Sequence, residues 1–219
     1  SFIDEYFTGN FKLKGWGVFG GLNFPEIARI EYEKKSDKYE HRFEGEKINF
    51  DYYTASFRGD KDKSLLDVYY AIPINELKPK KEKNVMASTL KEGIFFFDDK
   101  WNDIDKSVTK EKIYLHPKID STKNYYVIGT NQLKIEPGEY NFALEFQEED
   151  SKNTGTSRSK MKVDSYPFGI FNISDILLAS KIEKADKESK YIRNGLNIIP
   201  NPARSYQKDQ LLNVYFEIY

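Results

Sequence analysis

A cluster of acidic residues between positions 98 and 105 is the strongest candidate for an inorganic binding site in the chain. Carboxylate oxygens that converge from one loop could hold Ca²⁺, which prefers a shell of oxygen ligands. The candidate ligands are Asp99, Asp103 and Asp105. Their spacing is not that of an EF-hand, the expected glycine is missing, and two interspersed lysines offset the charge. A solvated loop is therefore the simpler interpretation, and we predict no resident metal or cofactor.

Trp101 lies inside this acidic stretch and is the candidate ligand-binding residue. Its ring could stack on a sugar or on the side chain of a partner. The alternative is that the ring covers the end of a β-sandwich, because large aromatic side chains dominate burial in protein cores.

The two histidines of the chain, His41 and His116, do not fall in any catalytic motif. No Gly-x-Ser-x-Gly elbow and no His-Glu-x-x-His pair is present, and a triad would need further partners brought in by the fold. The glycine-rich stretch Gly15–Gly21 lacks the register of a phosphate-binding loop and predicts a tight turn beside a buried Trp16. We therefore expect surface histidines and no enzymatic activity, and a hydrolase is the least favoured function.

Composition narrows the classes of partner. The 34 basic and 35 acidic residues give a formal net charge of -1, so nothing attracts the chain in bulk to nucleic acid. The absence of cysteine excludes disulfides and thiolate chemistry. No apolar run is long enough for a membrane-spanning helix. The chain starts without Met and ends inside a predicted strand, so we expect a processed or excised piece of a longer protein.

Alternating apolar residues predict β-strands in the centre of the chain. Leu66, Val68, Tyr70 and Ile72 share one side of a strand that we expect to lie on a core, and a Gly/Asp-rich connector joins this strand to the preceding run, 50–57, as a hairpin.

The clearest β pattern runs from position 133 to 163. Tyr140, Phe142, Leu144 and Phe146 alternate with polar residues after a Pro-Gly turn, and a returning strand follows. This arrangement is typical of the tyrosine corner of immunoglobulin-like sandwiches. Further strands are predicted at 85–90, 94–97, 113–119 and 125–128. In the tyrosine pairs at 52–53, 69–70 and 125–126, one ring should be buried and the other exposed.

These patterns predict a mainly β chain in three parts. Residues 1–45 form an irregular N-terminal segment, 46–166 an immunoglobulin-like antiparallel β-sandwich, and 167–219 a C-terminal β segment that begins a second sandwich or completes the first. In the last part, Ser174 could cap a short helix that carries Ile176 and Leu177, but 173–182 favours a strand. Alternate apolar residues from Leu212 to Ile218 predict another strand.

Several segments together resemble the bacterial GWxTD-domain proteins. The first is Phe57-Arg58-Gly59 through Asp67-Val68-Tyr69-Tyr70-Ala71-Ile72-Pro73, followed by Ser174-Asp175-Ile176-Leu177-Leu178-Ala179, Asn194-Gly195-Leu196 and Ile199-Pro200-Asn201-Pro202. The ending Val214-Tyr215-Phe216-Glu217-Ile218-Tyr219 completes the set. The motif that names the family is absent, so the match covers the β-rich region that follows it. The resemblance implies an exported, periplasmic or extracellular protein and supplies no catalytic residue.

The sequence therefore predicts a non-enzymatic structural or protein-interaction module of an exported bacterial multidomain protein. Its protein partner would bind at an exposed sheet edge or at aromatic residues in loops. The alternative is a carbohydrate-binding module that uses Trp101, with or without calcium held by the acidic loop.

Overall fold

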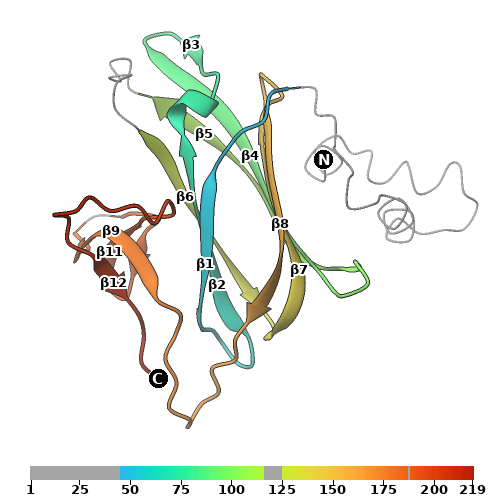
Figure 1. The fold of residues 1–219 in the computed structure, drawn as a ribbon, viewed down its shortest axis with the longest axis vertical. Coiled ribbons are helices and arrows are strands. Elements are labelled where there is room, and N and C mark those ends of the chain that lie inside the picture. The colour runs from blue at the N-terminus through green and yellow to red at the C-terminus, as the bar shows by residue number, and fades with distance from the viewer. Residues whose placement is uncertain (1–44, 116–124, 187) are drawn as a thin grey trace, which may run out of the picture. The chain divides into compact units, whose positions relative to one another are not determined.

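The computed structural model describes residues 45–115, 125–186 and 188–219, which form twelve β-strands and one short 3-10 turn, Ile74–Glu76 (Figure 1). All pairings between these strands are antiparallel, which confirms the predicted mainly β, antiparallel fold. None of the described residues belongs to a helix with the length and apolar character needed to cross a membrane.

The chain divides into two compact units, each built from segments that are distant in the sequence. Among the described residues, unit 1 comprises 45–48, 75–115 and 139–161. Unit 2 comprises 49–74, 125–138, 162–186 and 188–219. The predicted irregular segment, including Trp16 and His41, lies outside the described residues except for Gly45, and so does His116.

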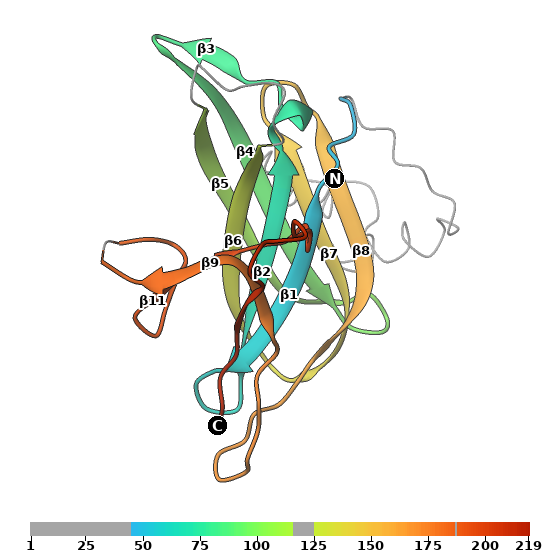
Figure 2. The same cartoon turned by 60° about the vertical axis from the view of Figure 1, so that its left-hand side comes forward.

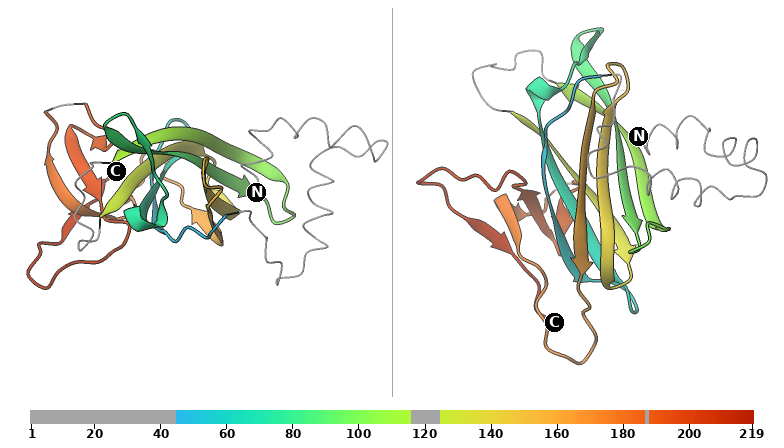
Figure 3. Two further views of the ribbon diagram at one scale, coloured as in Figure 1. Left: turned by 90° about the horizontal axis from the view of Figure 1, so that it is seen from above. Right: turned by 45° about the vertical axis from the view of Figure 1, so that its right-hand side comes forward.

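Unit 1 is a five-stranded sheet whose strands twist along their length (Figures 1 and 3). Strand β4 pairs with β3, β5 and β7, and β8 continues the sheet beyond β7. The strands are β3 (Lys80–Glu82), β4 (Val85–Phe97), β5 (Asp103–Leu115), β7 (Gly138–Glu148) and β8 (Thr154–Val163). The two short strands predicted at 85–90 and 94–97 are thus one continuous strand.

The predicted strand from Tyr140 to Phe146 is confirmed as part of β7. Phe142 lies opposite Phe96 of β4, with ring centroids 5.4 Å apart, and both side chains are fully buried. The Tyr140 ring meets Phe96 edge-on at 5.8 Å. The polar residues of the alternating pattern do not mark a solvated face, however, because Glu145 and Gln147 are buried as well.

Unit 2 contains two antiparallel sheets. The first is β1 (Asp51–Arg58), β2 (Ser64–Pro73) and β6 (Tyr126–Ile135), which lie side by side in that order and include the predicted hairpin (Figure 2). The second is formed by the C-terminal segment, which includes the predicted strand within 173–182. Its strands are β9 (Leu177–Lys184), β10 (Ile192–Arg193), β11 (Leu196–Pro200) and β12 (Asn213–Tyr215), in the order β10-β11-β9-β12.

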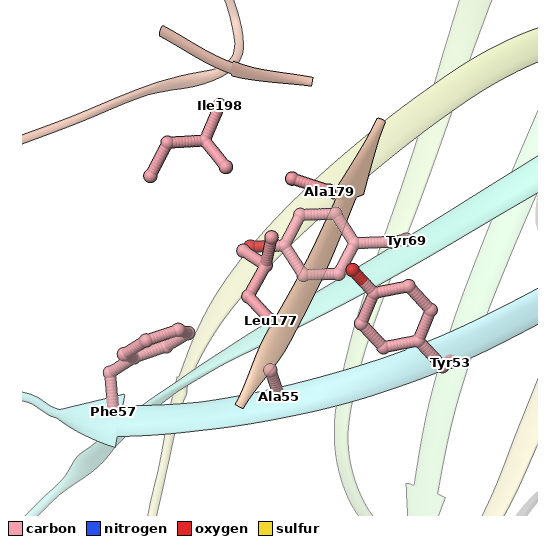
Figure 4. Close-up of a cluster of buried hydrophobic side chains, with 7 residues drawn as sticks. All are labelled: Tyr53, Ala55, Phe57, Tyr69, Leu177, Ala179 and Ile198. Carbon is pink, nitrogen blue, oxygen red and sulfur yellow. The ribbon is translucent and has the colours of Figure 1, made fainter. Parts of the chain in front are cut away.

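Buried side chains join these two sheets face to face, in a sandwich-like arrangement. From the first sheet, β1 and β2 supply Tyr53, Ala55, Phe57 and Tyr69; from the second, β9 and β11 supply Leu177, Ala179 and Ile198. Figure 4 shows these side chains pointing toward one another. The segment that was predicted to begin or complete a β unit therefore packs on β1 and β2.

Strand β2 is buried on both sides. The predicted core set from Leu66 to Ile72 is at most 3% exposed, and the opposite side, with Asp67 and Tyr69, is only 4% exposed. The prediction that one ring of each tyrosine pair is buried and the other exposed is therefore wrong for Tyr69 and Tyr70, which are both buried. It is also wrong at Tyr125 and Tyr126, which are both 40% exposed. The sandwich of unit 2 explains the first case, because β2 receives Leu177 and its neighbours on the side that sequence alternation assigns to solvent.

Candidate functional site

The acidic stretch forms a tight turn between β4 and β5. Asp98 closes the turn: its Oδ1 accepts hydrogen bonds from the backbone N–H groups of Lys100 and Asn102, both at 2.8 Å, and its Oδ2 accepts one from the Asn102 amide at 2.7 Å. Slight burial raises the pKa of Asp98, but these hydrogen bonds outweigh it, and the pKa is lowered.

The candidate calcium ligands do not converge. Asp99 is exposed in the turn, whereas Asp103 and Asp105 belong to strand β5 rather than to a loop. Asp103 forms an ion pair with Lys106 at 2.8 Å, and Asp105 accepts a hydrogen bond from the Lys106 backbone N–H at 2.8 Å. In the part of the chain that the structure describes, no three His, Asp or Glu side chains are grouped so that they could hold a metal ion.

Trp101 belongs to the apolar cluster of unit 1. Its ring lies 5.5 Å from the ring of Phe97, and the side chain is half-buried against a cluster that contains Phe95 and Ala143. Its backbone φ of 64° is in the left-handed region, which non-glycine residues seldom occupy. Packing on the end of a sheet therefore accounts for the position of this ring.

The most extensive polar arrangement in unit 2 was not predicted from the sequence, and it centres on Asp67 of β2. Asp67 Oδ2 accepts hydrogen bonds from the Tyr69 hydroxyl and from Arg193, both at 2.5 Å, and Oδ1 accepts one from Gln132 at 2.8 Å. The Arg193 guanidinium carbon lies 3.8 Å from the centre of the Phe57 ring. We call this set, with Glu217, the Asp67–Arg193 network.

Glu217 completes the network from the C-terminal segment. Its Oε1 lies 3.2 Å from Arg193 Nη1 and accepts a hydrogen bond from the Tyr215 hydroxyl at 2.9 Å, while Oε2 accepts one from the Tyr219 hydroxyl at 2.7 Å. The network thus links β2, β6, β10 and the end of the chain. These contacts satisfy buried charges and anchor strands, because a charge inside a protein is stable only when it is paired.

The electrostatics agree with this anchoring role. Burial alone would lower the pKa of Arg193, but the nearby charges of Asp67 and Glu217 outweigh it, and the pKa is raised. Burial, reinforced by the charge of Asp67, raises the pKa of the Tyr69 phenol far above its usual range. Burial and Glu217 raise the pKa of Tyr215 to about 12. These tyrosines therefore stay protonated and act as hydrogen-bond donors.

A pocket of about 210 Å³ lies beside the network. Its polar lining includes Thr130, Gln132, Lys190 and Tyr191, and its apolar lining includes Leu177 and Ile198. This volume is smaller than the roughly 300 Å³ at which ligand pockets for drug-sized molecules begin. The charged groups of Asp67 and Arg193 in its wall already bind each other, so the geometry does not select a class of ligand.

The C-terminal segment, 213–219, has an unusual distribution of polar and apolar residues; its first three residues form β12. Tyr215, Glu217 and Tyr219 point into hydrogen bonds of unit 2, whereas the alternate residues Val214 and Phe216 are 43% and 44% exposed. Ile218 is 63% exposed. The alternate apolar residues of this segment therefore face outward, in contrast to the usual arrangement of a sheet over a core.

The exposed apolar residues of the C-terminal segment continue onto the neighbouring segment. Ile218 pairs with Ile173 in an isolated bridge, and Val214 lies opposite Leu178 of β9. Between these two pairs lies Ile176, which is 59% exposed. We call Ile173, Ile176, Val214, Phe216 and Ile218 together the apolar face. Other exposed apolar residues precede its two segments in the sequence, at Ile170, Phe171, Leu211 and Leu212, and the exposed Phe168 lies against the Arg58 guanidinium.

The apolar face and the Asp67–Arg193 network differ in how far the sequence predicts them. Alternation from Leu212 to Ile218 predicts a strand there, of which the structure forms the three residues of β12, but alternation does not predict that the apolar side is exposed. The Asp67–Arg193 network has no sequence signal, because its two central residues are 126 positions apart.

Comparison with known proteins leaves these features to be interpreted from their chemistry. No protein-family model matches the chain, and no curated protein is similar enough in sequence to count as a relative.

Proposed function

We propose that the chain is a non-enzymatic protein-interaction module that binds its partner through the apolar face. The observation that carries this proposal is the exposure of Val214, Phe216 and Ile218 on one side of a strand whose other side is polar and hydrogen-bonded. A contiguous apolar patch of more than a few hundred Å² is rare on the surface of a monomeric soluble protein and usually marks an interaction site.

The chemistry of the remaining candidates supports binding over catalysis. The charged groups of Asp67, Arg193 and Glu217 are engaged with one another, and the tyrosines around them have raised pKa values and keep their protons. A general acid or base works best with a pKa near the operating pH, which these phenols do not have.

Site-specific photo-crosslinking in the source cells tests this proposal. A photoreactive phenylalanine analogue in place of Phe216 should give a discrete crosslinked product, and the same analogue in place of Ile104 serves as the control. Ile104 is a suitable control because it is 50% exposed but lies on β5 of unit 1. Equal crosslinking at the two positions, or no product from either, would refute a partner at the apolar face.

We also propose that the chain belongs to an exported bacterial multidomain protein. The support is the resemblance of the segments from Phe57 to Pro73 and from Ser174 to Tyr219 to the GWxTD-domain proteins. Fractionation of the source cells, with and without protease added to the outside of the inner membrane, measures this directly. Recovery of the protein in the protease-resistant cytoplasmic fraction would exclude export.

The alternative of a carbohydrate-binding module receives less support from the geometry. The Trp101 ring packs on Phe97, and the adjacent carboxylates are engaged with Lys106 and with the turn backbone. A glycan array would favour this alternative only if the chain bound a defined glycan and lost that binding in Trp101→Ala.

A further inference from the structure

We infer that the partner of the apolar face is the same face of a second copy of this chain, packed sheet against sheet about a two-fold axis. This inference rests on the proposed function, because it names the partner of that surface. The face suits such packing because its side chains come from two adjacent antiparallel segments. Ile173 lies opposite Ile218 and Leu178 lies opposite Val214, with a one-residue shift of register between the two pairs, so the apolar side chains form two columns rather than a single row.

The size of the face suits a weak, reversible dimer. Its five side chains are 43% to 63% exposed. With large apolar side chains contributing up to roughly 200 Å² each, the face exposes on the order of 500 Å². Two copies would bury about 1,000 Å² in total, which is the lower limit for a specific interface.

The charge distribution allows two identical faces to meet. Glu217 is the single charged residue from Leu211 to Tyr219, and its carboxylate lies on the opposite side of the strand, held by Arg193 at 3.2 Å. A two-fold axis brings each residue close to its own copy or to a symmetry-related neighbour, so any charge on the face would meet a like charge. The five face positions are apolar, and Asp175, which lies between Ile173 and Ile176 in the sequence, is held by the Ser56 backbone N–H at 2.7 Å.

Pairing of β12 edge to edge is the competing arrangement. The Leu178 carbonyl accepts a hydrogen bond from the Asn201 N–H at 3.0 Å, on the side of β9 away from β12. Leu178 and Val214 are therefore a non-hydrogen-bonded pair, and the Val214 N–H points away from β9 toward the outer edge. An added strand would use this N–H, whereas face-to-face packing would not.

The oligomeric state of the full chain tests the inference. Sedimentation of the wild-type chain over a range of concentrations should show a monomer–dimer equilibrium. Ile176→Lys places a charge on the face without touching the β12 edge, so we expect dimerisation at least tenfold weaker. Ile104→Lys, a matched change at an exposed isoleucine of unit 1, should leave it unchanged. Unchanged circular dichroism and thermal midpoint would confirm that both variants are folded.

Val214→Pro separates the two arrangements, because proline keeps an apolar side chain but removes the outward N–H. Face-to-face packing predicts that this variant still dimerises. Dissociation in Val214→Pro with retention in Ile176→Lys would overturn the inference in favour of strand addition. A wild-type chain that stays monomeric would also overturn it. For a monomeric wild-type chain, the Phe216 crosslink decides about the proposed function. If Ile176→Lys abolished this crosslink, the apolar face would bind a different partner and the proposed function would stand. If the crosslink persisted, the proposed function and the dimer would both be refuted.

Discussion

The side chain of Arg193 lies between two carboxylates and is only 13% exposed. Its replacement by methionine keeps an apolar side chain but removes the guanidinium that lies over Phe57 and pairs with Asp67 and Glu217. Removing one partner of a buried ion pair costs several kcal/mol, because the remaining charge is desolvated and uncompensated. We expect Arg193→Met to lower the free energy of unfolding by about 3 kcal/mol in urea titrations.

The matched control for this prediction is Lys181→Met. Lys181 forms an ion pair with Glu183 at 2.6 Å, but both side chains are largely exposed. Exposed pairs contribute little, so a loss below about 0.5 kcal/mol is expected. Equal losses in the two variants would mean that Arg193 has no special role in unit 2.

Gly129 provides a second test at single-residue resolution. It lies opposite Tyr70 in the pairing of β2 with β6, and a Cβ at this position would lie 1.9 Å from a carbon of the Tyr70 ring. The ring is only 3% exposed and has little room to move. We expect Gly129→Ala to destabilise the protein by about 2 kcal/mol through overpacking, measured by urea unfolding.

A double-mutant cycle identifies the cause of that loss. Tyr70→Leu removes the ring carbons that the new methyl group would meet, so the double variant Gly129→Ala/Tyr70→Leu should be more stable than the sum of the single changes predicts. Strict additivity would indicate that the glycine is needed for backbone freedom rather than for space.

At the scale of the element, the β4–β5 turn holds Trp101 in a left-handed conformation, with φ 64°. Glycine adopts this conformation without strain, whereas other residues are disfavoured by roughly 1 kcal/mol. We therefore predict that Trp101→Gly is about 1 kcal/mol more stable than Trp101→Ala in urea unfolding, although both lose the contact with Phe97. A more stable alanine variant would show that the turn relaxes to another conformation when the ring is absent.

The strands themselves show what alternation predicts and what it does not. The hairpin of β1 and β2, the strand from Tyr140 to Phe146 and the apolar set from Leu66 to Ile72 follow from their period of two. The burial of Asp67 and Tyr69 does not, because it depends on a second sheet formed by the C-terminal segment. Polar residues mark a solvated side only when no other element covers it.

At the scale of the whole molecule, local sequence patterns also do not show which residues the fold brings together into a candidate site. Asp99, Asp103 and Asp105 are candidates because they are close in the sequence, yet Asp99 lies in the turn, whereas Asp103 and Asp105 lie on strand β5 and are both engaged with Lys106. The residues that do converge, Asp67 and Arg193, belong to β2 and β10 and come together only when unit 2 is assembled. The spacing of residues along the sequence can identify a site formed by one loop, but it misses a site whose residues come from distant strands.

Assembly of unit 2 also predicts its response to alkali. Five tyrosines of this unit have raised pKa values, with burial the largest cause for each: Tyr53, Tyr69, Tyr166, Tyr215 and Tyr219. In the unfolded chain these phenols ionise near pH 10, whereas in the folded unit they keep their protons. The unfolded state therefore binds fewer protons above pH 10, and the free energy of unfolding of unit 2 falls as the pH rises further.

Two spectroscopic signals can follow this loss. Phenolate absorbance should rise in two steps, with these five tyrosines ionising late and together with unfolding. Tryptophan fluorescence in a Trp16→Phe background comes from Trp101 alone and follows the unfolding of unit 1. Tyr219→Phe removes one phenol with a raised pKa and should make the free energy of unfolding less steeply dependent on pH above 10.

If all sixteen tyrosines ionised near pH 10 while the far-ultraviolet circular dichroism stayed unchanged, these five phenols of unit 2 could not be buried as described. The anchoring role of the Asp67–Arg193 network would then lose its physical basis, because Tyr69, Tyr215 and Tyr219 donate to its carboxylates only while they are protonated.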